Sequence, residues 1–86
     1  MKKVTVYTRA FCPFCTRALS LLERKGAEVT EIDATFDPAA KAEMIQKANG
    51  MRTFPQIFIG ETHIGGCDEL HALERAGGLD PLLAGA

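Results

Sequence analysis

Two cysteines three positions apart, Cys12 and Cys15, lie where the sequence changes from a strand pattern to a helix pattern. Upstream, apolar and polar residues alternate over residues 3–8, which is typical of a half-buried strand. Downstream, apolar residues recur at three- and four-residue intervals, which predicts a helix over 13–25. Pro13 suits the first helical position, because its missing N–H would have no partner there. We therefore expect the cysteine pair at a strand-to-helix turn, with Cys12 as the N-cap.

An N-cap position favours the ionised form of a cysteine. The free backbone N–H groups of the first turn and the positive end of the helix dipole both face Cys12. A free cysteine has a pKa of about 8.5, whereas cysteines at helix N-termini in such motifs have pKa values of roughly 3.5–7.5. Cys15 follows one helical turn later on the same face, where it should be less exposed and less acidic. We interpret Cys12 as the nucleophile and Cys15 as the resolving thiol.

Length, charge and cysteine count limit the functional classes. The 86 residues suit a single domain, 1–86, and a net charge of −1 with mixed signs gives no basic patch for nucleic acid. No run approaches the ~20 apolar residues of a membrane span, and the N-terminus lacks a secretory signal pattern. Three cysteines, an odd number, disfavour a framework of structural disulfides. We expect a cytoplasmic protein in a reducing setting, with no membrane or nucleic-acid partner.

The remaining elements alternate between strands and helices. A helix between the first two strands predicts a parallel, right-handed pair, and a short turn between the last two predicts an antiparallel hairpin. The fold class is therefore α/β, a four-stranded mixed sheet flanked by three main helices. The predicted elements are a strand over 28–33, a helix that Asp37 caps and Asn49-Gly50 ends, strands over 56–59 and 62–64, a helix from Cys67 or Asp68 with Asp68 as its cap, and a further helical turn over 80–83.

Three motifs in this order resemble the glutaredoxin family, in its small bacterial dithiol class, and the match extends over essentially the whole chain. The motifs are Cys12-Pro13-Phe14-Cys15, the segment 53–59 (TFPQIFI) and the segment 64–68 (IGGCD). The resemblance implies a thioredoxin-like fold and a glutathione-dependent thiol–disulfide oxidoreductase. Two positions depart from the usual pattern: Phe14 stands where the family usually has tyrosine, and Phe54 where it usually has valine.

The resemblance also implies a glutathione site around Cys12. Cys12 is expected to form the mixed disulfide with glutathione, and Arg9 to face its glycine carboxylate. Residues 53–55, with Pro55 in the cis form, would present backbone groups to the glutathione cysteine. Residues 66–68 would hold the γ-glutamyl end, since a helix N-terminus offers N–H groups to a carboxylate. The residues that the resemblance assigns to glutathione are Arg9, Phe14, Thr53, Phe54, Pro55, Gly66, Cys67 and Asp68.

The implied partners are glutathione and proteins that carry disulfides. Expected substrates are protein disulfides and glutathione–protein mixed disulfides, with electron donation to reductive enzymes such as ribonucleotide reductase and a role in cell redox homeostasis. We expect the chain to act as a monomer, with glutathione as reductant and co-substrate and no metal.

Other readings of the cysteines stay open. Cys12 and Cys15 with Cys67 and His71 would form a zinc-like set, although the helix-starting Pro13 inside the first pair disfavours it. A glutathione-ligated iron–sulfur cluster and a thioredoxin-like protein reduced by a flavoenzyme are further alternatives. Cys67 is more simply explained as a buried small apolar residue, and His71, like His63, as a surface or packing residue.

Overall fold

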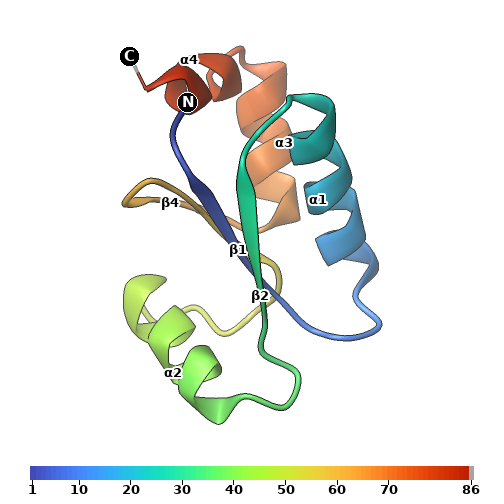
Figure 1. Cartoon of the computed structure of the whole chain (residues 1–86), viewed down its shortest axis with the longest axis vertical. Coiled ribbons are helices and arrows are strands. Elements are labelled where there is room, and N and C mark those ends of the chain that lie inside the picture. The colour runs from blue at the N-terminus through green and yellow to red at the C-terminus, as the bar shows by residue number, and fades with distance from the viewer. Residues whose placement is uncertain (86) are drawn as a thin grey trace.

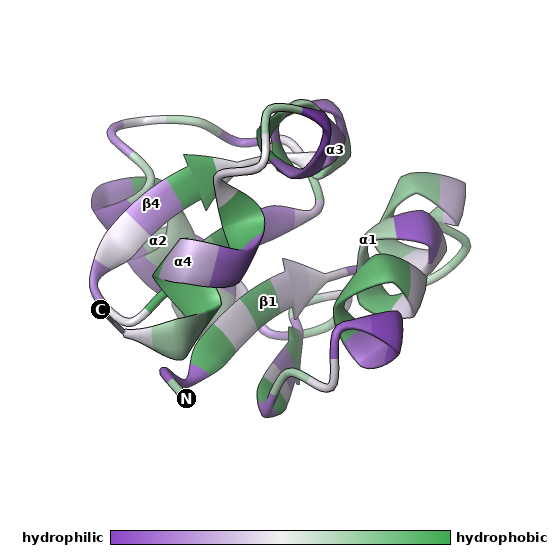
Figure 2. Cartoon of the chain, turned by 90° about the horizontal axis from the view of Figure 1, so that it is seen from above, coloured by the Kyte–Doolittle hydropathy of each residue, from purple (hydrophilic) through white to green (hydrophobic). Residues whose placement is uncertain are grey.

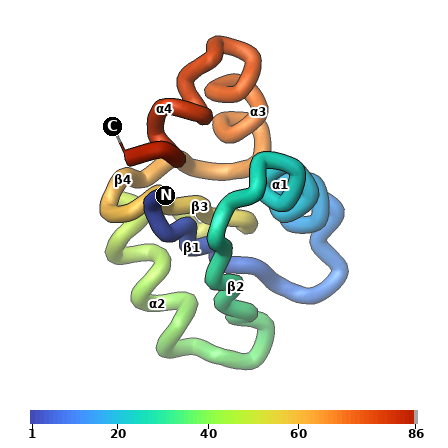
Figure 3. The backbone as a smooth tube through the Cα atoms, turned by 45° about the horizontal axis from the view of Figure 1, so that its top comes forward, coloured from blue at the N-terminus to red at the C-terminus, as the bar shows by residue number. Residues whose placement is uncertain are grey.

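The computed structural model describes residues 1–85 as a four-stranded sheet with helices on both faces. The strands stand in the order β2-β1-β3-β4 (Figure 3). No helix in this part of the chain has the length and apolar character needed to cross a membrane. The elements are β1 (Val4–Thr8), α1 (Pro13–Arg24), β2 (Val29–Asp33), α2 (Pro38–Lys47), β3 (Gln56–Ile59), β4 (Thr62–Gly65), α3 (Cys67–Arg75) and α4 (Leu79–Ala84).

The strand pairing confirms the predicted topology. β1 runs parallel to β2 with Val4 opposite Val29, and antiparallel to β3 with Tyr7 opposite Gln56. β3 and β4 form the antiparallel hairpin. The parallel pair follows from the helical crossover and the antiparallel pair from the short turn between the strands.

The two faces of the sheet carry separate apolar clusters. Helices α1, α3 and α4 cover one face, where Val6 and Ile57 of the sheet pack against Leu22 of α1 (Figure 1). α2 covers the other face alone, with Tyr7 and Met44 in its cluster. The alternation of side chains along β1 explains the division, because successive residues of a strand point to opposite faces.

The helix boundaries follow local signals. Hydrophobic and hydrophilic bands alternate along α1 in Figure 2, as expected for a helix with one buried side. Lys25 ends α1, and Gly26 follows in a left-handed conformation with φ 70°. Asp37 caps α2 as predicted, with its Oδ1 accepting a hydrogen bond of 3.0 Å from the Ala40 N–H.

The predicted start of α3 at Cys67 is confirmed, but the predicted cap is wrong by two residues. The N-cap is Gly66 and not Asp68, which is an exposed residue within the first turn. The Glu69 carboxylate reaches back and accepts a hydrogen bond of 2.7 Å from the Gly66 N–H. The carboxylate three residues after the cap therefore braces this helix start, as in the return half of a capping box. α4 also extends beyond the predicted 80–83, to Leu79–Ala84.

Candidate active site at the start of α1

The cysteine pair occupies the predicted strand-to-helix turn. Cys12 is the N-cap of α1 with extended backbone (φ −118°, ψ 96°), and Pro13 is the first helical residue. Cys12 and Cys15 are joined as a disulfide, with their Cα atoms 5.2 Å apart. The Cys15 N–H donates a hydrogen bond of 3.2 Å to Cys12 Sγ. The sulfur of Cys12 thus lies where an anion at this helix start would lie.

Both cysteines are buried. The exposed fractions are 7% for Cys12 and 4% for Cys15. The order agrees with the prediction that Cys15 is the less exposed, but the difference is small. A partner must therefore approach Cys12 from a defined direction.

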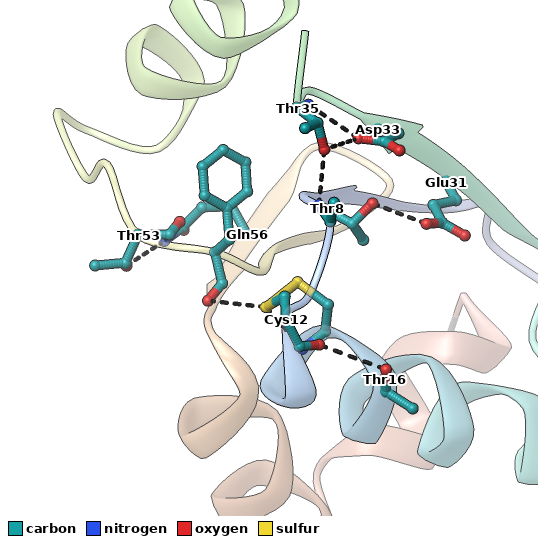
Figure 4. Close-up of a disulfide and its surroundings, with 11 residues drawn as sticks. Thr8, Cys12, Thr16, Glu31, Asp33, Thr35, Thr53 and Gln56 are labelled. Atoms are coloured by element: carbon teal, nitrogen blue, oxygen red, sulfur yellow. Dashed lines mark hydrogen bonds between the residues drawn. A yellow bond between two sulfur atoms is a disulfide. The ribbon is translucent and has the colours of Figure 1, made fainter.

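The loop before Cys12 is held by the segment that follows β2 (Figure 4). The Ala10 N–H donates a hydrogen bond of 2.7 Å to Thr35 Oγ1, and the Thr35 hydroxyl donates one of 2.5 Å to Asp33 Oδ1. The two hydrogen bonds from Thr35, from its side chain and then its backbone, lower the pKa of the Asp33 carboxyl. The sequence-based prediction missed this brace. The only local signal was an aspartate two residues before a threonine, which favours a turn.

Phe11, directly before Cys12, has an unusual backbone conformation. Its φ of 55° lies in the left-handed region, which bulky residues rarely adopt. Its side chain is 98% exposed, so no packing compensates for this strain. Such outliers concentrate at functional sites, where the surrounding structure imposes them. No sequence pattern indicated the strain at this position.

The segment opposite Cys12 consists of residues 53–55, called the proline turn below. The Phe54–Pro55 peptide bond is cis, as expected. The Phe54 carbonyl oxygen lies 3.9 Å from Cys12 Sγ. The proline turn and the start of α1 therefore bring backbone groups to the same sulfur from two separate parts of the chain.

A groove of about 270 Å³ runs beside this turn. It brings together every residue that the sequence assigned to glutathione except Arg9. Met51 and Glu69 also border it and were not predicted. The predicted residues that line this groove are Phe14, Thr53, Phe54, Pro55, Gly66, Cys67 and Asp68.

Arg9 lies in a different groove, of about 420 Å³. Its neighbours there include Phe11, Cys12 and Glu31. Cys12 borders this second groove and does not line the proline-turn groove, to which it is linked through the Phe54 carbonyl oxygen 3.9 Å from its Sγ.

Arg17 is a cation at the active-site end that the sequence-based prediction did not include. Its guanidinium carbon lies 5.7 Å from the centroid of the Phe14 ring, within the range of a cation–π contact. The sequence does contain a signal for this contact, because Phe14 and Arg17 are three positions apart and such residues are neighbours on a helix. Its charge also acts on Cys67, which lines the groove.

Cys67 is a free, buried cysteine, as predicted. Burial raises the pKa of its thiol, the Asp68 carboxylate raises it further, and the Arg17 charge partly opposes both. Its Sγ lies 3.4 Å from His71 Nδ1, which also lies 2.9 Å from the Cys67 carbonyl oxygen. At neutral pH this cysteine is therefore a protonated, packed side chain.

The zinc-like alternative lacks a preformed site. Within residues 1–85, no three or more cysteine, histidine, aspartate or glutamate side chains lie close enough together to hold a metal ion. Cys67 and His71 touch each other, but they do not join Cys12 and Cys15 in one cluster.

Comparison with known proteins places this geometry among glutaredoxins. The glutaredoxin family model matches residues 4–64. A protein of Pseudomonas aeruginosa named glutaredoxin is 57% identical over 84 residues, which cover 98% of this chain and 99% of the relative.

Two solved structures extend the likeness to three dimensions. The solution structure of glutaredoxin from Brucella melitensis has a TM-score of 0.83 and 58% identity, and the match covers 96% of this chain and 89% of that one. A crystal structure described as a buckwheat glutaredoxin–glutathione complex has a TM-score of 0.85 and 34% identity, with 94% and 76% covered. The fold of this chain is thus shared with solved structures of glutaredoxins.

Proposed function

Because this chain belongs to the glutaredoxin family of glutathione-dependent thiol–disulfide oxidoreductases, we propose that its Cys12-Pro13-Phe14-Cys15 site reduces both protein disulfides and glutathione–protein mixed disulfides. The observation that carries the proposal is the hydrogen bond from the Cys15 N–H to Cys12 Sγ. A donor fixed on the sulfur favours its anion over its thiol. The thiolate is the form that attacks disulfides.

With a glutathione–protein mixed disulfide, only Cys12 reacts. Its thiolate attacks the glutathionyl sulfur, the mixed disulfide bond breaks, and the protein leaves as a thiolate that takes a proton from solvent. The thiolate of a second glutathione then attacks the glutathionyl sulfur on Cys12. Glutathione disulfide leaves and the Cys12 thiolate is regenerated, which closes the electron balance.

With a protein disulfide, both cysteines react. Cys12 attacks one substrate sulfur and forms a mixed disulfide with the protein. Cys15 then loses its proton and attacks Cys12 Sγ, which releases the reduced substrate and forms the Cys12–Cys15 bond. One glutathione opens this bond and a second removes the first as glutathione disulfide. The 5.2 Å between the two Cα atoms suits this internal disulfide.

We propose that glutathione binds in the groove beside the proline turn. The backbone of residues 53–55 pairs with its cysteine residue, the start of α3 at residues 66–68 receives the γ-glutamyl end, and Phe14 borders the bound sulfur. Arg9 approaches the glycine carboxylate from the second groove. The groove lining supports the first three assignments, and the buckwheat structure, described as a glutathione complex, is a relative with this fold.

We further propose that the chain works as a monomer in the cytoplasm and passes electrons to reductive enzymes such as ribonucleotide reductase. One chain supplies both cysteines and the whole groove lining. A free Cys67 and a single cysteine pair fit a reducing compartment, where glutathione keeps thiols reduced.

The test is a glutathione-coupled assay on two substrates, a small glutathione mixed disulfide and a protein disulfide. Cys12→Ser should abolish the reduction of both, while Cys15→Ser should retain reduction of the mixed disulfide and lose that of the protein disulfide. Equal activity of the two variants on the mixed disulfide would remove these roles. Replacing glutathione by thioredoxin reductase as electron donor should support no turnover, and turnover at an equal rate would favour the thioredoxin-like alternative.

A further inference from the structure

The Gln56 side chain is a buried polar group that the reaction above does not use. It follows the cis Pro55 as the first residue of β3, and its exposed fraction is 0%. A buried amide is costly unless its donors and acceptor are paired. The hydrogen-bond partners of Gln56 therefore indicate what the residue does.

Gln56 joins the proline-turn loop to β4. Its Nε2 donates hydrogen bonds to the Thr53 carbonyl oxygen at 3.0 Å and to Thr53 Oγ1 at 3.1 Å (Figure 4). Its Oε1 lies 2.7 Å from His63 Nε2. The His63 ring also stacks on Phe58 with centroids 5.0 Å apart, which restricts the orientation of the ring.

These contacts determine where the protons lie. The Thr53 carbonyl can only accept, so the Gln56 NH₂ group must face Thr53 and the amide oxygen must face His63. His63 Nε2 must then carry a hydrogen, whether the imidazole is neutral or charged. His63 thus holds Gln56 in the one orientation that donates to Thr53.

The same hydrogen-bond assignment determines the direction of the Thr53 hydroxyl hydrogen. Its oxygen accepts from Gln56 Nε2, so its own hydrogen must point away from the amide. Thr53 is exposed and lines the groove beside the proline turn. Within residues 1–85 the structure gives this hydroxyl hydrogen no acceptor, so it is available to a molecule in the groove.

We propose that Gln56, oriented by His63, is a positioning residue that presents the Thr53 hydroxyl as a donor to an acceptor oxygen of the thiol co-substrate. This inference rests on the proposed function. It states which chemical group of the co-substrate the groove recognises beside Thr53. The co-substrate carries a carboxylate or peptide carbonyl oxygen at this place, as glutathione does. A small disulfide without such an oxygen gains nothing from Gln56.

The test compares the rates at which two different disulfides oxidise the fully reduced protein. The rate of Cys12–Cys15 oxidation is measured by acid quenching and mass spectrometry, with either glutathione disulfide or bis(2-hydroxyethyl) disulfide as oxidant. Gln56→Met removes the amide and keeps a side chain of similar length, and it should slow the reaction with glutathione disulfide about fivefold, as expected for one lost hydrogen bond. The rate with the hydroxyethyl compound should stay within about twofold.

The matched control is Gln46→Met on the exposed side of α2, which should change neither rate. Equal slowing of Gln56→Met with both oxidants, or slowing with neither, would overturn the inference. A wild-type protein that reduces the hydroxyethyl compound but not glutathione disulfide would overturn the proposed function as well, so the two failures are distinguishable.

A double-mutant cycle tests the route through Thr53. Thr53→Val should slow the reaction with glutathione disulfide about fivefold, and adding Gln56→Met should slow it by less than about twofold more. Fully additive losses would contradict the inference. If Gln56→Met does not fold, His63→Phe keeps the stacking on Phe58 and removes the donor to Gln56. His63→Phe should slow only the oxidation by glutathione disulfide. A variant that reacts with glutathione disulfide as fast as the wild type would again overturn the inference.

Discussion

Two helices of this protein begin beside a cysteine, and we propose that only the cysteine at the start of α1 is catalytic. Cys12 is the N-cap of α1, and its sulfur accepts a hydrogen bond from the Cys15 N–H. Cys67 is one position further along, the first residue of α3, and its sulfur faces His71 instead. Burial raises the pKa of Cys67 first, and the Asp68 carboxylate then adds to the effect. We infer that the position of each sulfur relative to the free N–H groups sets its reactivity, and that proximity to a helix N-terminus alone does not.

The residues before the two cysteines differ in the same sense. Phe11 precedes Cys12 with φ 55° and a side chain that is 98% exposed. Gly65 and Gly66 precede Cys67, and Glu69 accepts a hydrogen bond from the Gly66 N–H. The Glu69 side chain therefore braces the start of α3, while the start of α1 carries a strained residue whose side chain is exposed.

The largest expected effect comes from removing the sulfur of Cys12 or of Cys67 in turn. Cys12→Ser should reduce activity on a glutathione mixed disulfide by more than about a thousandfold, because it removes the nucleophile. Cys67→Ser should reduce it by less than about tenfold, because that thiol is protonated and its backbone stays in place. A steady-state glutathione-coupled assay measures both. A large loss from Cys67→Ser alone would remove the distinction between the two cysteines.

A glycine substitution tests whether the start of α3 is packed. A Cβ at Gly65 would lie 2.9 Å from Glu69 Oε1, and the residue has φ 113°. Gly65→Ala should lower the free energy of unfolding by about 2–4 kcal/mol through both effects. Gly77 also has positive φ, 76°, but nothing lies within 4 Å of its Cβ position. Gly77→Ala is the matched control and should cost about 1–2 kcal/mol; equal costs in urea unfolding would show that packing adds nothing at Gly65.

The opposite substitution tests strain at the start of α1. Phe11→Gly should raise the free energy of unfolding by about 0.5–1 kcal/mol, because glycine adopts φ 55° without the steric cost that phenylalanine bears there. Glycine also gains entropy in the unfolded chain, which limits the increase. Chemical denaturation of the reduced protein measures the change. A decrease would mean that Phe11 makes stabilising contacts and is not strained.

The smallest expected effects are on the titration of Cys67. Asp68→Asn should lower the pKa of the Cys67 thiol, since the Asp68 carboxylate raises it. Arg17→Gln should raise this pKa, since the guanidinium lowers it. Because folding raises the pKa, the folded state is favoured while Cys67 is protonated. That contribution is lost as the pH rises above the value of the unfolded chain. Alkylation rates of Cys67 against pH, followed by peptide mass spectrometry, measure both shifts; shifts in the reverse directions would contradict the electrostatic picture.

Much of the fold was predictable because its signals are local. Periodicity located the strands and helices, and Asp37-Pro38 and Gly26 marked ends that the structure confirms. The cap of α3 was the exception. Asp68 has the usual capping chemistry, but the carboxylate of Glu69 reaches back to the Gly66 N–H and takes that function.

For the candidate site, the sequence indicated which residues lie near one another but not their geometry. The resemblance to a family indicated the cis Pro55 and most of the groove lining. The brace between Ala10 and Thr35 spans 25 positions, and the contact of Gln56 with His63 depends on how β3 and β4 pair. Such contacts are set by tertiary packing and leave no periodic or compositional signal. For the same reason, the sequence did not show that Arg9 lies in a separate groove.

The central claim is that α1 stabilises the anion of Cys12, and the most direct test is the pKa of this thiol in the reduced native protein. It is measured from the rate of iodoacetamide alkylation of Cys12 against pH, with the modified peptide identified by mass spectrometry. The hydrogen bond from the Cys15 N–H and the dipole of α1 predict a pKa well below the value of about 8.5 for a free cysteine. A pKa at or above that value would contradict the account.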